Sequence, residues 1–275
     1  MNLSISEKLL YSTIQIRCNM YGGGESSGTG FFYNFIDGDK VYPAIITNKH
    51  VLEGATNIKV KFTKTNDEGI PQDIDHIEYL VEKNIIIFHR SQDVDLCAIL
   101  IGNILTENAN LSYMPLDSKM IPSEEEIKKF KAIEDITMIG YPIGLIDYIN
   151  NKPIIRKGIT ATHIKFDYNG KKEFLIDAAC FPGSSGSPVF ILNEGMFTGS
   201  DGNAYVGNRI FLIGVLYAGP QHTVTGNIEA VTIPTRTIPL SVTSIPINLG
   251  YVIKAGKIKE LEKQVIEEIR KINNR

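Results

Sequence analysis

Short apolar runs rich in Ile, Val, Phe and Tyr recur along most of this chain, with Gly, Asn and Asp between them. Many short strands divided by turn residues are typical of all-β barrels and sandwiches. The first set of predicted strands comprises Thr13–Cys18, Gly30–Phe35, Val41–Thr47, Asn57–Phe62, Ile77–Val81, Asn84–Phe88 and Val94–Ile101. The second set comprises Asp135–Gly140, Ile154–Thr162, Glu173–Ala178, Pro188–Leu192, Ile210–Tyr217, Ala230–Ile233 and Ile247–Ile253. The 275 residues are enough for a sizeable core, and we predict two antiparallel β-barrels.

The segments outside these strands differ in composition. Residues 103–134 are more polar, and Ser123 followed by glutamates fits either a capped helix or a charged linker. Five apolar residues recur at helical spacing in the tail: Ile258, Leu261, Val265, Ile269 and Ile272. This spacing predicts a terminal helix that docks one apolar stripe on the barrels, while a connection to a further domain or a partner helix is the alternative.

We therefore expect one unit over residues 1–275. Its first barrel covers about 12–102, the crossing between barrels about 103–134, the second barrel about 135–253 and the C-terminal helix about 255–273. Near the N-terminus, Ser6 is expected to cap a short helical turn that ends at Tyr11.

Ser185 stands between glycines in the string that runs from Phe181 to Pro188, FPGSSGSP. Glycine permits a sharp turn and removes side chains near a reacting atom. The amides of Gly183 and Ser185 can then face one point, where an oxyanion would develop. The string suits a nucleophilic serine, although a Gly/Ser loop between two strands would have the same composition.

A serine nucleophile needs a base, and the base needs an acid that orients it. His50 ends an apolar strand that begins at Ala44, and Asp95 introduces the apolar run Leu96–Leu100. Each residue alone could be structural, since aspartate often forms turns. Together they follow the chain order His, Asp, Ser, which is that of the chymotrypsin-type triad.

The motifs of this chain resemble those of bacterial trypsin-like serine peptidases of the chymotrypsin fold. The similarity extends to intracellular trypsin-like domains, high-temperature-requirement proteases and the glutamyl-endopeptidase group. The motifs that carry it are Ser27–Phe32, Ile46–Val51, Asp95–Ala98, Met138–Gly144, Asp177–Pro188 and Ile213–Gly219. The resemblance implies a serine endopeptidase that hydrolyses protein or peptide substrates through an acyl-enzyme, with no cofactor. A latent peptide-binding or protein-binding module is the first alternative, and an esterase-like acyl hydrolase is the second.

The resemblance also implies a substrate pocket and a mode of control. The pocket would contain Ala179, Cys180, Tyr217, Ala218 and Gly219, with Ala179 at its base. By the same resemblance, an aspartate at the position of Ala179 would select Lys or Arg, and a histidine at the position of Leu216 would select Glu. Neither is present, so we expect a small or medium apolar residue at the cleavage position. Ser184 replaces the aspartate that pairs with a newly cleaved N-terminus in secreted trypsins. Control by a regulatory domain, an activating partner or ordering of the Gly183 loop is expected instead.

Other acids and bases compete for these roles. Asp93 lies on the same side of an extended chain as Asp95, but the family pattern selects Asp95. The remaining histidines are His76, His89, His163 and His222. Of these, only His222 lies in a long connection, from Pro220 to Pro246, where functional residues are common.

Composition limits the partners of the chain. A net charge of −3 and a pI near 6.0 give no case for nucleic-acid binding. The three scattered cysteines, Cys18, Cys97 and Cys180, form no CxxC and predict neither a metal site nor a disulfide framework. The glycine-rich segment Tyr21–Gly30 lacks the GK[ST] of a phosphate-binding loop. Without a membrane-length apolar stretch or a signal core, we expect a cytoplasmic protein that does not bind membranes.

Overall fold

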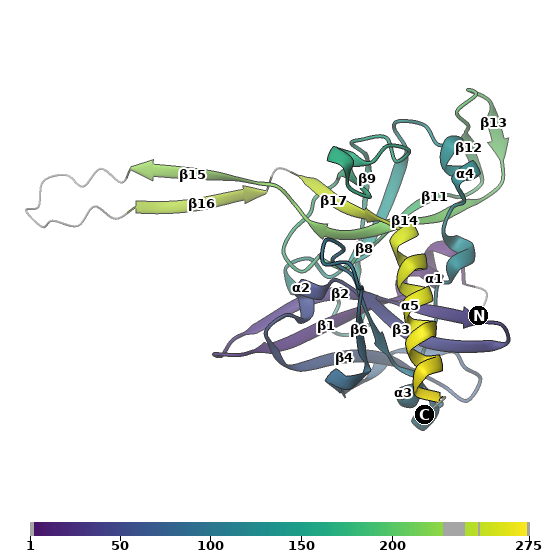
Figure 1. Ribbon diagram of the computed structural model, residues 1–275, viewed down its shortest axis with the longest axis vertical. Coiled ribbons are helices and arrows are strands. Elements are labelled where there is room, and N and C mark those ends of the chain that lie inside the picture. The colour runs from purple at the N-terminus through teal and green to yellow at the C-terminus, as the bar shows by residue number, and fades with distance from the viewer. Residues whose placement is uncertain (1–2, 228–239, 247, 274–275) are drawn as a thin grey trace, which may run out of the picture.

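The computed structural model describes residues 3–227, 240–246 and 248–273, and antiparallel strands dominate it (Figure 1). Seven strands of the first half form one sheet in the order β5-β4-β1-β2-β3-β7-β6. They are β1 (Thr13–Met20), β2 (Glu25–Asp37), β3 (Lys40–Thr47), β4 (Ala55–Thr65), β5 (Pro71–Val81), β6 (Ile86–Phe88) and β7 (Cys97–Leu100). In β1, Ile14, Ile16 and Cys18 alternate with polar residues and are buried in one apolar cluster. This period of two is why the segment forms a strand with one face in the core.

Six strands of the second half close into a barrel in the order β10-β17-β14-β11-β8-β9. They are β8 (Asp135–Gly140), β9 (Ile154–Thr160), β10 (Glu173–Asp177), β11 (Pro188–Asn193), β14 (Arg209–Ala218) and β17 (Leu249–Lys254). The predicted all-β fold with a C-terminal helix is confirmed. Six strands of the second predicted set close into the barrel, and the first set forms the seven-stranded sheet.

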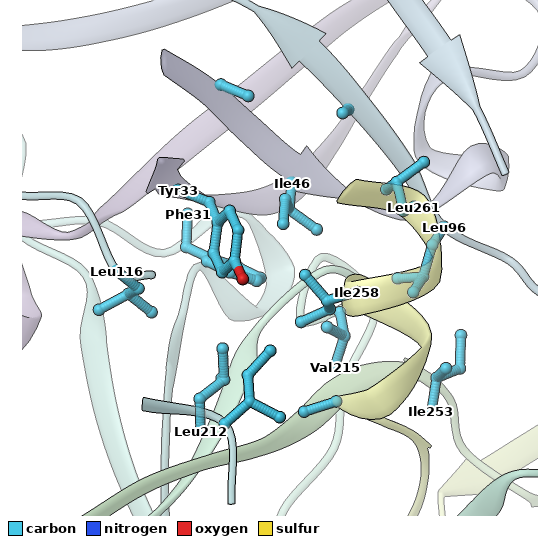
Figure 2. Close-up of a cluster of buried hydrophobic side chains, with 14 of the residues drawn as sticks. Phe31, Tyr33, Ile46, Leu96, Leu116, Leu212, Val215, Ile253, Ile258 and Leu261 are labelled. Carbon is cyan, nitrogen blue, oxygen red and sulfur yellow. The ribbon is translucent and has the colours of Figure 1, made fainter. Parts of the chain in front are cut away.

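The helix α5 (Gly256–Asn273) packs against both halves. Its residues Ile258, Leu261 and Val265 are fully buried in a cluster with side chains from the sheet and from the barrel. Figure 2 shows Leu261 beside Leu96 and Ile258 beside Val215. The predicted docking of an apolar stripe is therefore correct, although Ile272, at its end, is 70 % exposed. Because α5 touches the core from both halves, it fixes how the two sheets meet.

The short helices begin where the sequence supplies a cap. In α1 (Ile5–Tyr11) the cap is Ser4 rather than the predicted Ser6, because only Ser4 has a glutamate three residues later. The Ser4 side chain accepts from the Glu7 N–H at 3.3 Å, and Glu7 Oε2 accepts from the Ser4 N–H at 2.7 Å. Ser123 caps α4 (Glu124–Lys128) in the same way, so the polar crossing contains a capped helix.

Some connections are more elaborate than the sequence pattern predicted. The hairpin of β12 (Met196–Thr198) and β13 (Ala204–Val206) was not predicted. Nor was the pair formed by β15 (Gln221–Asn227) and β16 (Leu240–Pro246), which projects from the body in Figure 1. The predicted strand Ala230–Ile233 lies outside the described residues. The predicted strand Val94–Ile101 shortens to β7, because Asp93–Leu96 forms a loop.

The remaining described elements are short. They are α2 (Lys49–Leu52), α3 (Gly102–Glu107) and the 3₁₀ turns η1 (Lys83–Ile85), η2 (Ser118–Met120), η3 (Pro142–Gly144) and η4 (Tyr168–Gly170). Of these, α2 and η3 lie beside the residues that the sequence singles out as functional.

Candidate active site

His50 and Asp95 lie next to neighbouring strands of the first sheet. β3 ends at Thr47, so His50 belongs to α2 rather than to the end of the strand. Asp95 lies in the loop before β7, and β7 pairs with β3. The distance from His50 Nδ1 to Asp95 Oδ2 is 2.5 Å, and the His50 backbone N–H donates to Asp95 Oδ1 at 3.1 Å. One carboxylate thus holds both the ring and the main chain of His50.

The surroundings of Asp95 favour its ionised form. Burial alone raises the pKa of Asp95, but hydrogen bonds from the His50 ring and from nearby backbone N–H groups outweigh it and hold the pKa below its ordinary value. An ionised carboxylate can only accept, so the proton of this contact lies on His50 Nδ1. In the neutral ring, Nε2 is then the free acceptor, and the ring is 41 % exposed. The geometry leaves a base available to a neighbouring hydroxyl.

Ser185 lies in the loop between β10 and β11 of the barrel, and Thr29 of β2 holds this loop against the first sheet. The Thr29 N–H donates to the Ser185 carbonyl at 2.8 Å, and the Thr29 hydroxyl donates to the Gly183 carbonyl at 2.9 Å. The Thr29 carbonyl in turn accepts from the Thr47 hydroxyl at 2.7 Å. No separate feature of the sequence singles out Thr29. Its only signal was its place in the Ser27–Phe32 motif.

Two glycines allow the close approach of this loop. Gly183 and Gly186 both have φ of 87°, a conformation that residues with a Cβ rarely adopt. A Cβ on Gly183 would lie 2.6 Å from the Tyr141 carbonyl oxygen, and one on Gly186 would collide with the Thr29 carbonyl. The predicted need for glycine on either side of Ser185 therefore has a specific cause, because backbone carbonyls occupy the space of the missing side chains.

The peptide group between Pro182 and Gly183 is turned so that its carbonyl accepts from the Ile143 N–H at 2.5 Å. In a trans peptide the N–H points opposite to the carbonyl, so the Gly183 N–H faces away from Ile143. Within the described residues, neither the Gly183 nor the Ser185 N–H has an acceptor in the protein. Two backbone donors therefore stay available beside the Ser185 hydroxyl. Ile143 itself has φ of 53°, which is strained for a β-branched residue.

The Ser185 hydroxyl donates to the Tyr217 carbonyl at 3.3 Å. This hydrogen bond goes to β14, and no hydrogen bond joins Ser185 to His50 among the described residues. Tyr217 O is an acceptor that the sequence did not identify.

A cavity of about 150 Å³ opens beside Ser185. Its lining residues are Cys180, Phe181, Pro182, Ser185, Leu216, Ala218, Gly219 and Pro220. Of the predicted pocket residues, Cys180, Ala218 and Gly219 line it, whereas Ala179 and Tyr217 do not. Burial raises the pKa of Cys180 to about 11, so its thiol is neutral at physiological pH. The side chains of this wall carry no charge.

The competing acids and bases lie elsewhere. Asp93 is exposed and lines a different cavity, with Lys171 and Lys172. His76 contacts the Tyr148 carbonyl at 3.3 Å. His89 is buried, and His163 accepts from the Lys165 N–H. His222 lies in β15, and its side chain is not among those that the structure describes. In the part of the chain that is described, His50 is the histidine that contacts an aspartate.

The cysteines Cys18, Cys97 and Cys180 are free and buried. Burial raises the pKa of each thiol, that of Cys18 to about 11. Over the described ranges, no group of three His, Cys, Asp or Glu residues is placed to hold a metal ion. No helix within those ranges is both long enough and apolar enough to span a bilayer.

Comparison with known proteins identifies a family and similar folds. A family model described as "Trypsin-like peptidase domain" matches residues 28–199. No curated protein matched the chain. Among solved structures, "HtrA-type protease AlgW with tripeptide" has a TM-score of 0.51 and 16 % identity, and the match covers 97 % of this chain and 64 % of that one. "Structure of GrC" has a TM-score of 0.52 and 13 % identity, with 96 % of both chains covered. These likenesses concern the fold, and this chain spans less than two thirds of the AlgW chain.

Proposed function

Because the chain belongs to the trypsin-like peptidase domain family, we propose that it cleaves peptide bonds through a triad of His50, Asp95 and Ser185. Family membership makes it a serine endopeptidase in general terms. The observation that carries the specific assignment is the contact of His50 Nδ1 with Asp95 Oδ2 at 2.5 Å, with Ser185 at the mouth of a cavity on the adjoining barrel. The proposed unit remains the whole of residues 1–275, with the site where the two halves meet.

In the proposed reaction, Ser185 Oγ attacks the scissile carbonyl while His50 Nε2 takes the hydroxyl proton. Asp95 holds the ring in the required tautomer and stabilises the imidazolium that forms. The ester between Ser185 and the acyl half of the substrate replaces the peptide bond, and the proton on His50 passes to the leaving amine. Water then attacks the ester by the same route and releases the acid. Every proton taken by His50 is thus returned within one cycle.

The Gly183 and Ser185 N–H groups are the proposed oxyanion hole. Both are free of protein acceptors among the described residues, and the bond from Ile143 to the Pro182 carbonyl supports the inward orientation of the Gly183 N–H. Donors fixed in advance stabilise the tetrahedral oxyanion without reorganisation at the moment of reaction. The same bond gives a physical role to the strained backbone of Ile143.

The proposed substrates are proteins or peptides with a small or medium apolar residue before the scissile bond. The side chains of the cavity beside Ser185 are uncharged, and its volume of about 150 Å³ is small for a pocket that takes a long side chain. A positional peptide library tests this preference. Cleavage dominated by Arg, Lys or Glu would contradict it.

One observation favours a second candidate, a latent peptidase domain that an activating partner or domain converts to the active form. The Ser185 hydroxyl donates to Tyr217 O, and it must leave this acceptor to reach His50. In a latent domain, control would act on the release of this hydrogen bond or on the Gly183 loop.

The cytoplasmic location and the absence of membrane or nucleic-acid partners stay predictions from the sequence.

A fluorophosphonate serine-hydrolase probe distinguishes these candidates. Wild type should be labelled covalently at Ser185, and Ser185→Ala should not. Labelling that persists in Ser185→Ala would remove Ser185 from the mechanism. A well-folded wild type without labelling would mean that the proposed triad is not assembled at rest, and it would favour the latent domain.

A further inference from the structure

Gln264 of α5 uses its whole side-chain amide to hold the segment that precedes Asp95. Its Nε2 donates to the Phe88 carbonyl at 2.7 Å, and its Oε1 accepts from the Arg90 N–H at 2.9 Å. Its Nε2 also donates to Glu268 Oε1 on the same helix at 3.1 Å. The residue is only 6 % exposed. A buried amide whose two N–H protons both have acceptors is a rigid link between the helix and the main chain on both sides of His89.

The segment held by Gln264 is in turn bonded to the loop that carries Asp95. The His89 N–H donates to the Leu96 carbonyl at 2.9 Å, one residue after Asp95. On the other side of the loop, the Val94 N–H donates to the Ser91 carbonyl at 3.3 Å. Both ends of this short loop are therefore attached to residues 89–91, and Gln264 holds the backbone of residues 88 and 90.

A second contact ties the same loop to the same helix. Leu96 is fully buried in the cluster that contains Ile258, Leu261 and Val265 of α5, and Figure 2 shows it beside Leu261. Packing is non-directional and permits small shifts, whereas hydrogen bonds fix position and angle. The two contacts therefore have different effects, since Leu96 stabilises the loop and Gln264 sets where it lies.

We propose that Gln264 is a positioning residue for Asp95, so that α5 sets the geometry of the contact between Asp95 and His50. This inference rests on the proposed function, in which that contact orients the general base. Without the amide, the Phe88 carbonyl and the Arg90 N–H would be left without their partner, and the loop would relax toward other donors and acceptors. A shift of Asp95 by a fraction of an ångström would misplace the imidazole while leaving the substrate cavity intact.

The test compares Gln264→Met with Gln264→Glu. Methionine has a similar length and no amide, whereas glutamate can still accept from the Arg90 N–H. Lys263→Met is the matched control, because Lys263 is exposed on the same helix and receives the same side chain. Active sites are counted by fluorophosphonate labelling, so that turnover is expressed for folded, competent molecules only. For peptide cleavage, kcat in Gln264→Met should fall by about 10-fold to 100-fold with KM unchanged, since misplacement by about 1 Å costs up to about 100-fold.

The two remaining variants should show smaller losses of kcat than Gln264→Met. Gln264→Glu should lose less than Gln264→Met, and Lys263→Met should match wild type. Fewer active sites with an unchanged kcat in both Gln264 variants would assign Gln264 to folding alone and would overturn the inference. If Gln264→Met does not fold, Gln264→Glu decides the same question.

An NMR measurement that does not depend on substrate turnover separates this inference from the proposed function. In Ser185→Ala protein, the NMR resonance of the His50 Nδ1 proton reports the contact with Asp95 directly. Gln264→Met should move or broaden this resonance, and Lys263→Met should not. An unchanged resonance in Gln264→Met would overturn the inference even if wild type cleaves peptides. A wild type that neither labels nor cleaves would remove the proposal of a peptidase that is active at rest, and the resonance alone would then decide the role of Gln264.

Discussion

Replacing Gly183 by alanine tests the oxyanion-hole geometry with a matched control in the same chain. Gly183 and Gly195 have nearly equal φ angles, 87° and 86°. A Cβ on Gly195 meets nothing within 4 Å, whereas one on Gly183 would lie 2.6 Å from Tyr141 O and 3.1 Å from the Ile143 nitrogen. The two substitutions therefore share the cost of a left-handed backbone, and only Gly183→Ala also displaces the loop beside Ser185.

The two effects have separate expected sizes. A left-handed conformation costs an L-residue about 1–2 kcal/mol, so both variants should lose about that much free energy of unfolding. The collision with Tyr141 O must be relieved by moving the loop, which takes the Gly183 N–H away from the oxyanion. Loss of one such donor reduces kcat by about 10²–10³-fold. We therefore expect Gly183→Ala to lose about 10²-fold or more in kcat, and Gly195→Ala to keep the wild-type value within about twofold.

Urea unfolding gives the stability of each variant, and peptide cleavage per labelled active site gives its turnover. KM should change little, because the cavity walls other than this loop stay in place. Equal kcat in the two variants would refute the argument that the Gly183 N–H stabilises the transition state. A much larger loss of stability in Gly183→Ala, with normal turnover per active site, would show that the collision affects folding only.

Further outcomes follow from the charged groups. Asp95→Asn should reduce kcat by about 10⁴-fold and Asp93→Asn should leave it near wild type, as measured on one peptide substrate. Since the pKa of Asp95 is lowered in the folded state, this carboxylate stabilises the fold above its ordinary pKa, and that stability is lost as pH falls through the folded pKa. As the pH falls from the ordinary Asp pKa toward the lower folded pKa, the free energy of unfolding of Asp95→Asn should thus fall less steeply than that of wild type. Glu134 is 1 % exposed and bound to Arg209 at 2.5 Å, so Glu134→Gln should cost about 3–5 kcal/mol in urea unfolding. Glu125→Gln, in an exposed pair, should cost less than about 1 kcal/mol.

The sequence predicted the fold class well because the strands follow from local patterns. Alternating apolar residues, as in Ile14 to Cys18, need one buried face, and this requirement is local. The hairpins were missed for the opposite reason. β12 is only three residues long, and its burial pattern is exposed or intermediate throughout, so no apolar period marks it. The loop at Asp93–Leu96 was read as a strand because burial of Val94 and Leu96 imitates the same alternation.

For the candidate site, residue types were predictable and their relations were not. His50, Asp95 and Ser185 stood out by motif and order, yet the acceptor of the Ser185 hydroxyl is a backbone carbonyl at Tyr217. Backbone groups are identical at every position, so no residue type signals such a bond. The same limit applies to Gln264, which reads as one more polar residue on a helix. Its role depends on Phe88 O, which is 176 positions away in the sequence.

A site divided between two sheets can only be as accurate as their packing. His50 and Asp95 come from the first sheet, Ser185 comes from the barrel, and Thr29 is one hydrogen-bonded link between the sheet and the loop of Ser185. Thr29→Val tests this link, because valine keeps the shape but can neither donate to the Gly183 carbonyl nor accept from the Tyr141 N–H. It should reduce turnover per active site and leave the contact of His50 with Asp95, seen by its proton resonance, unchanged. If Thr29→Val and Gln264→Met disturbed the same resonance equally, the two links would not act on separate halves of the site, and this division of roles would be wrong.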